Sequence, residues 1–230
     1  MIQSAVVTAA AAGLVGTAIA SVSPFTETFD TAANWAGSDF QPLTEVATGG
    51  LDGSSYVSTT GNFQNVDPTT DEGSFQVLFR GEPSFLPGIV PDASDGAFIG
   101  DYIDAGIETI SLDVRHDGVA PVNFFVRIAN VNRFPGAVAV FFVPVFAGSW
   151  ATIEIDISAD SPNFVSFEGQ DYDAVFSNAG VVQVGIDARP LAGIPSDFTF
   201  DVDNVSINVP TPGAFAAVAL GGFAAARRRR

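Results

Sequence analysis

The body of the chain alternates between apolar and polar positions with a period of two, which is the pattern of a half-buried β-strand. In residues 109–115 the apolar side chains of Ile110, Leu112 and Val114 share one face. No segment of the body shows the 3.6-residue periodicity of an amphipathic helix, so we expect strands and no helix there. The same alternation recurs in four further runs: residues 75–79, 122–128, 150–157 and 182–186.

Residues 137–145 are almost wholly apolar, which predicts a strand buried on both faces, with Pro144 near its end limiting it to an edge or a strand terminus. Turn signals separate the runs, for example Asp117-Gly118 and Pro135-Gly136. Roughly ten short strands follow. The predicted fold class is all-β: a two-sheet antiparallel β-sandwich of jelly-roll type, flanked by a signal helix and a short hydrophobic helix.

In the last predicted strand the apolar positions change phase once. A bulge at Asp203-Asn204 would restore the register and leave Asp201 and Asp203 side by side on the polar face. The two apolar sets are Phe198, Phe200 and Val202, then Val205, Ile207 and Val209.

Residues 1–20 are apolar, rich in alanine and free of acidic side chains. Ala18-Ile19-Ala20 has the small residues that a signal peptidase needs, and the apolar core is too short for a membrane span. We therefore expect a cleaved signal peptide with Ser21 as the mature start. No Lys or Arg precedes the apolar stretch, which would be explained if the true start, with a basic segment, lay upstream of Met1. The alternative to a signal peptide is a buried N-terminal helix.

The C-terminal end has three parts in order: the motif Val209-Pro210-Thr211-Pro212, an apolar stretch from Ala214 to Ala226, and the cluster Arg227, Arg228, Arg229 and Arg230. The apolar stretch would reach only about 20 Å as a helix, short of the roughly 30 Å hydrocarbon core of a bilayer. An arginine cluster stays in the cytoplasm, so residues 21–208 would lie outside. The pattern predicts a transient anchor preceded by a cleavage signal.

This order of Pro motif, short apolar helix and Arg cluster resembles the PEP-CTERM sorting domain, although Thr211 stands where that family usually has Glu. The resemblance implies processing by an exosortase-type membrane enzyme, transient anchoring in the inner membrane and delivery to the bacterial cell surface, outer envelope or extracellular matrix. A GPI-type signal is the competing interpretation, and four terminal arginines argue against it.

Charge and composition narrow the function. The chain carries 26 acidic residues against nine Arg and no Lys, with a net charge of −17, so nucleic-acid binding is excluded by repulsion from phosphate. Such a field attracts divalent cations and cationic surfaces, or simply keeps the protein soluble in a salty medium. There is no Cys and one His, which removes disulfides, zinc thiolates and most general-base chemistry. We therefore expect a protein that is not an enzyme.

Four groups of residues suggest a family resemblance: residues 25–30 with Trp35, then residues 49–56, 98–102 and 200–205. With these motifs the body resembles the laminin-B-like and carbohydrate-binding-module jelly rolls. The resemblance implies a structural calcium held between the first and last strands by Glu27, Asp30, Asp201 and Asp203. Calcium prefers six to eight oxygen ligands, and crowded carboxylates repel without a cation. The alternative is a set of solvated acids at the strand edges.

Carbohydrate binding would use an exposed aromatic face for stacking on a sugar ring. Trp35, in a loop-like region, is the better candidate, although core or edge packing competes with that role. Trp150 is expected in the core. His116, in the run Arg115-His116-Asp117, is expected to be a loop residue without a catalytic partner, because neighbouring strand residues point to opposite faces.

The sequence thus predicts a signal peptide at 1–20, a β-sandwich at 21–208 and a sorting tail at 209–230. The first functional hypothesis is a non-catalytic protein with a role in adhesion, the envelope or exopolysaccharide. The alternatives are a carbohydrate-binding module with a specific glycan site, and less favourably a secreted glycan-active enzyme. The expected partners are an exosortase, the export machinery and an extracellular polysaccharide.

Overall fold

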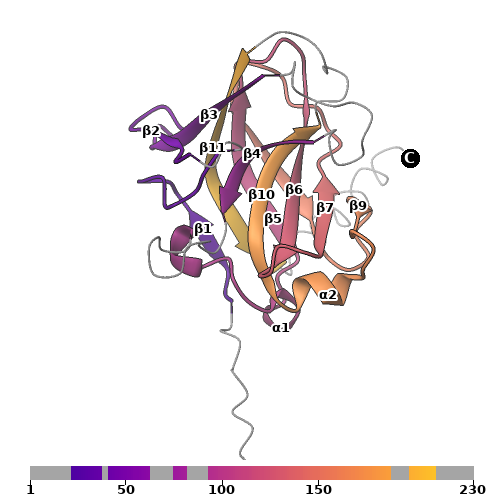
Figure 1. Cartoon of the computed structure of the whole chain (residues 1–230). Coiled ribbons are helices and arrows are strands. Elements are labelled where there is room, and N and C mark those ends of the chain that lie inside the picture. The colour runs from indigo at the N-terminus through magenta and orange to yellow at the C-terminus, as the bar shows by residue number, and fades with distance from the viewer. Residues whose placement is uncertain (1–21, 38–40, 63–74, 82–92, 188–196, 211–230) are drawn as a thin grey trace, which may run out of the picture.

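In the computed structural model the described residues are 22–37, 41–62, 75–81, 93–187 and 197–210, and they form two antiparallel sheets packed face to face (Figure 1). The first sheet has the strand order β2-β3-β11-β5-β8, and β1 also pairs with β11. Its strands are β1 (Phe25–Glu27), β2 (Thr44–Val46), β3 (Tyr56–Asn62), β5 (Thr109–His116), β8 (Ala151–Asp156) and β11 (Asp197–Asn208).

The second sheet has the order β4-β10-β6-β7-β9. All the pairings in both sheets are antiparallel, so the predicted two-sheet β-sandwich of jelly-roll type is confirmed. Its strands are β4 (Phe75–Gly81), β6 (Asn123–Asn130), β7 (Gly136–Val140), β9 (Phe164–Ser166) and β10 (Ala179–Asp187).

The core lies between the sheets and is built from the alternating positions that the sequence pattern identified. On β5, Ile110, Leu112 and Val114 are at most 1% exposed, and Ile153 and Ile155 of β8 pack beside them. Burial of this continuous apolar layer is the main stabilising contribution, since the chain has no disulfide.

The predicted bulge in β11 is present. The pairing of β11 with β5 shifts register between Asp203 and Ser206, and Asn204 takes a left-handed φ of 50°. The shift keeps Val205 and Ile207 in the core. Asp203 consequently lies directly opposite Asp113 on the outer face of the first sheet.

The expectation of no helix in the body is wrong for two short segments, α1 (Tyr102–Ala105) and α2 (Tyr172–Phe176). Each is N-capped by an aspartate: the side chain of Asp101 accepts from the amide of Asp104, and that of Asp171 accepts from the amide of Ala174. A single helical turn is too short to show a 3.6-residue period, so the pattern could not reveal it.

The prediction of a buried strand over residues 137–145 is wrong at its C-terminal half. β7 ends at Val140, and the connection that follows exposes Phe142, Val143 and Phe146 at 58%, 62% and 71%. Pro144 has no N–H group to donate to a neighbouring strand, and pairing resumes only at Val145, as an isolated bridge to Val122.

The proposed signal peptide, with Ala18 and Ala20 at its cleavage position, lies outside the described residues, and so do Thr211, Pro212 and the four terminal arginines. Val209 and Pro210 directly follow β11. Within the described ranges, no helix has the length and apolar character needed to cross a bilayer.

Candidate functional site

A pocket with a volume of about 900 Å³ opens beside β1 at the edge of the first sheet. Phe25 and several alanines form the apolar part of its lining, with Trp35 behind them. The polar part includes an amide and several carboxylates, and none of the described lining residues is Lys, Arg or His. The acidic and amide residues that line it are Glu27, Asp30, Asn34, Glu45 and Asp95.

Trp35 anchors the turn that forms the pocket wall. Its ring is completely buried, its Nε1 donates to Ser94 Oγ at 2.8 Å, and its edges meet Phe29 and Phe98 with centroids 5.5 and 5.7 Å apart. A ring with no exposed face cannot stack on a sugar in this structure. Trp35 as a carbohydrate platform is therefore corrected to a core residue, whose role is to position the pocket from beneath.

The pocket wall includes unusual backbone. Ala33, Asn34, Ser94 and Asp95 all have φ between 45° and 61°, a left-handed conformation that is uncommon for residues other than glycine. The amide of Ser94 donates to the carbonyl of Ala33 at 2.8 Å. This hydrogen bond joins the two left-handed segments, Ala33-Asn34 and Ser94-Asp95. Such conformations persist only where surrounding structure fixes them.

Three of the pocket carboxylates are fixed by hydrogen bonds. Glu27 accepts from the amide of Phe29 at 3.0 Å, and Glu45 accepts from the amide of Ala32 at 2.7 Å. Asp30 accepts from Ser55 Oγ at 3.2 Å. Each of these bonds uses one carboxylate oxygen, so β1, β2 and the turn between them present ordered acceptors.

The four proposed calcium ligands do not come together as one set. Glu27 and Asp30 share the pocket, whereas Asp201 forms an ion pair with Arg115 at 2.7 Å and Asp203 accepts from Ser54 Oγ at 2.8 Å. Among the described residues, no group of three or more His, Asp or Glu is placed to hold a metal ion. Structural calcium remains a prediction from the resemblance.

A second acidic feature lies on the outer face of the first sheet, where Asp113 and Asp203 are 6% and 0% exposed. Burial raises the pKa of Asp203, the hydrogen bond from Ser54 opposes that effect, and the charges of Asp113 and Asp52 add to the increase. Gly50 lies against this carboxylate: a Cβ there would come within 2.6 Å of Asp203 Oδ2. The loop that contains Gly50 therefore packs against Asp203.

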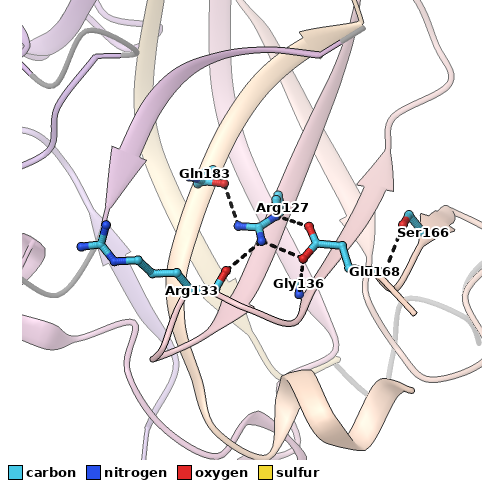
Figure 2. Close-up of polar contacts among 6 residues, drawn as sticks. All are labelled: Arg127, Arg133, Gly136, Ser166, Glu168 and Gln183. Carbon is cyan, nitrogen blue, oxygen red and sulfur yellow. Dashed lines mark hydrogen bonds and ion pairs between the residues drawn. The ribbon is translucent and has the colours of Figure 1, made fainter. Parts of the chain in front are cut away.

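The second sheet carries an ion pair at its outer face (Figure 2). Arg127 Nε and Nη2 donate to the two oxygens of Glu168 at 2.5 and 2.9 Å, Nη1 donates to Gln183 Oε1 at 3.0 Å, and the Arg133 carbonyl also accepts from Nη2. The amide of Gly136 donates to Glu168 as well, at 2.8 Å. Burial raises the pKa of Glu168, but the hydrogen bonds and charge of Arg127 outweigh it and the net pKa lies below its ordinary value. The network is closed upon itself, which is typical of a structural clamp.

The Trp and Tyr residues that could have stacked on a sugar are engaged with protein groups. Trp150 is half-buried at the surface rather than in the core: its Nε1 donates to the Gly49 carbonyl, and the Arg115 guanidinium lies 4.7 Å from its ring centroid. Arg115 is also 5.1 Å from the ring centroid of Tyr56. Tyr172 stacks on a neighbouring phenylalanine with centroids 4.3 Å apart, and Tyr102 is fully buried.

His116 is not a loop residue, as the sequence had indicated, but the last residue of β5, and it is 1% exposed. Its Nε2 is 3.0 Å from the carbonyl of Val145, its Nδ1 accepts from the amide of Gly118, and its ring stacks on Phe200. These contacts make it a core histidine with both ring nitrogens hydrogen-bonded.

Asn34, Glu45 and Asp95 of the pocket were not predicted as site residues. In the sequence, Asp95 belongs to an Asp-Gly turn signal and forms with Asp92 a weaker acidic pair better explained by a turn, and Glu45 is only a charge next to a short strand. Their convergence depends on the pairing of β2 with β3 and on the contact of Ser94 with Trp35, neither of which leaves a local pattern.

No family model matches the chain, and no curated protein matches it. Among solved structures it is similar to a carbohydrate-binding module specific for non-crystalline cellulose, with 16% identity over 83% of this chain and 100% of that chain and a TM-score of 0.46. It is also similar to xylanase modules from Clostridium thermocellum complexed with xylohexaose (18% identity, 81% of this chain, TM-score 0.46) and to an exo-β-agarase (13% identity, 80% of this chain, TM-score 0.48). The chain spans 28% and 24% of the lengths of these two. These similarities concern the fold alone.

Proposed function

We propose that the sandwich is a non-catalytic glycan-binding module within an exported protein. The observation that carries this proposal is the pocket beside β1, which combines an apolar wall with ordered carboxylate and amide oxygens. Sugar hydroxyls donate to such acceptors, while the C–H faces of the sugar rings pack on apolar surface. The 900 Å³ volume is in the range of small-molecule sites and accommodates a few sugar units.

The test is saturable binding of the purified protein on a polysaccharide panel, with Glu45→Ala as the pocket variant. Glu45 lines the pocket and fixes the amide of Ala32, so its truncation removes one acceptor and loosens the wall. We expect affinity to fall roughly three- to ten-fold, the equivalent of one hydrogen bond. Glu154→Ala is the matched control, because Glu154 is exposed on β8 and does not line the pocket.

Two results would contradict the proposal. Folded protein that binds no polysaccharide on the panel would exclude the glycan-binding role. Release of reducing sugar from any polysaccharide by the purified protein would show that the domain is catalytic instead.

The proposal includes export and surface sorting, which the two terminal segments support through their sequence patterns. A module that binds polysaccharide outside the cell needs both delivery and retention, and the signal-like and PEP-CTERM-like segments would provide them. Its partners would then be an exosortase-type enzyme during processing and an extracellular polysaccharide afterwards.

A further inference from the structure

We propose that the pocket beside β1 selects glycans that carry free amino groups, such as polymers with unacetylated amino sugars. This inference rests on the proposed function and specifies its ligand class. Four carboxylates line the pocket, at Glu27, Asp30, Glu45 and Asp95, and none of the described residues that line it is cationic. An ammonium group on the ligand is the charge complement of this lining.

The positions of the four acids favour an extended ligand over a single ion. Glu27 is on β1, Asp30 is in the turn that follows, Glu45 is on β2, and Asp95 is in the 3₁₀ segment Ala93–Gly96. Within the described part of the chain, no three such groups converge in the way that a metal ion requires. Because the four charges belong to different segments of the lining, they suit a ligand with several cationic groups better than a single ion.

The hydrogen bonds within the wall leave acceptor capacity for such a ligand. The bonds to the amides of Phe29 and Ala32 and to the hydroxyl of Ser55 use one oxygen each of Glu27, Glu45 and Asp30. A carboxylate has two oxygens and about four lone-pair positions, so each can also accept from an ammonium group. Hydrogen bonds between charged groups are about twice as strong as those between neutral groups.

The same charges disfavour acidic glycans. A uronic acid or a sulfated sugar would place an anion among the four carboxylates, and the described part of the lining has no cationic residue to offset it. The net charge of −17 extends the repulsion beyond the pocket and steers cationic ligands towards the protein.

The experiment is calorimetric titration of the purified full-length exported protein with three oligosaccharide probes: deacetylated glucosamine hexamer, its fully N-acetylated counterpart, and a galacturonic acid oligomer. We expect the deacetylated hexamer to bind at least roughly ten-fold more tightly than the N-acetylated one, from several partly exposed charge pairs. The difference should shrink at high salt, and the acidic oligomer should not bind.

Four charge-neutralising variants test the assignment: Glu27→Gln, Asp30→Asn, Glu45→Gln and Asp95→Asn. Each keeps an amide oxygen in place of the carboxylate oxygen. We expect each to weaken binding of the deacetylated hexamer roughly two- to five-fold and to weaken binding of the N-acetylated hexamer less, because the remaining amide oxygen still accepts from a sugar hydroxyl. Glu154→Gln on β8 is the matched control and should change neither affinity. Thermal melting of every variant shows which ones are folded.

The outcomes separate this inference from the proposed function. Equal affinity for the two hexamers would overturn the amine selectivity and leave the glycan-binding role in place. Binding of neither hexamer, together with no binding on the wider panel, would overturn both. Binding of the deacetylated hexamer that disappears with a chelator would show a metal-bridged contact and would also overturn the inference.

Discussion

At the scale of single residues, the most unusual arrangement is the pair of buried carboxylates Asp113 and Asp203 on adjacent strands. Asp113 accepts from Thr152 Oγ1 and Asn204 Nδ2, and Asp203 accepts from Ser54 Oγ, so both are satisfied by neutral groups. Burial and the facing carboxylate raise the pKa of Asp203. When folding raises the pKa of a carboxylate, the native state is more stable with that carboxylate protonated than with it ionised.

The stability of the domain should therefore respond to this group in a defined direction. The contribution of protonated Asp203 is fully present below its ordinary pKa of 3.8 and is lost as the pH rises through the raised value. Asp203→Asn removes the ionisation, so we expect a larger free energy of unfolding and a higher melting temperature at neutral pH. Thermal melts across the acidic pH range measure this.

The control for this measurement is Glu154→Gln, which removes a carboxylate from an exposed position of the same sheet. If Asp203→Asn is instead less stable than the unsubstituted protein at neutral pH, and this loss becomes smaller in acid, the carboxylate is ionised and stabilising in the native state.

Individual residues were harder to predict than the fold. The phase change of the apolar positions identified the bulge at Asp203-Asn204, because a slip of one residue would have put Val205 and Ile207 in solvent. Whether Trp35 or His116 is exposed depends instead on which distant segments cover it. Ser94 and Val145 provide those contacts, at separations of 59 and 29 residues.

At the scale of elements, the clamp between Arg127 and Glu168 joins β6, β7, β10 and the loop before α2 (Figure 2). The two side chains are 18% and 16% exposed. A Cβ on Gly136 would lie 2.7 Å from the Arg127 guanidinium, so the clamp depends on glycine at the start of β7.

We expect Glu168→Gln to destabilise the domain by about 2 kcal/mol, because it leaves a mostly buried guanidinium without its counterion and the remaining exposure moderates the loss. The pKa of Glu168 is lowered on folding, so its contribution is present above the ordinary value of 4.5 and is lost as the pH falls through the folded value. Denaturant unfolding at neutral and acidic pH measures both effects.

The loss in Glu168→Gln should accordingly be largest at neutral pH and become smaller in acid. A loss of the same size at both pH values would mean that shape and hydrogen bonding, rather than charge, account for the role of Glu168.

The sequence predicted the ends of a strand correctly where apolar and polar residues alternate strongly, and incorrectly where they do not. β5 and β8 match their predicted runs because each has one buried and one polar face. Residues 137–145 lack alternation, so their composition could not show that pairing ends at Val140. The capped turns α1 and α2 were missed because they are four and five residues long.

At the scale of the whole molecule, the acidic sandwich and its two terminal segments make a prediction about processing. If the tail is a sorting signal, the mature protein recovered from the producing cells should begin at Ser21 and lack Arg227–Arg230. Intact-mass spectrometry of surface and medium fractions measures both ends. Mature protein that retains the arginine cluster and is found in the cytosol would contradict the localisation.

The antiparallel register of β1 and β11 has a consequence for orientation. Phe25 pairs with Ile207, so the residues that enter β1 and those that leave β11 emerge at the same end of the sandwich (Figure 1). His116, the last residue of β5, pairs with Phe200 near the other end of β11, so it lies at the opposite end of the sandwich. The loops next to His116 carry the exposed side chains of Val119 and Phe146. If either terminal segment attached the protein to a surface, the end of the sandwich that carries Val119 and Phe146 would lie farthest from that surface.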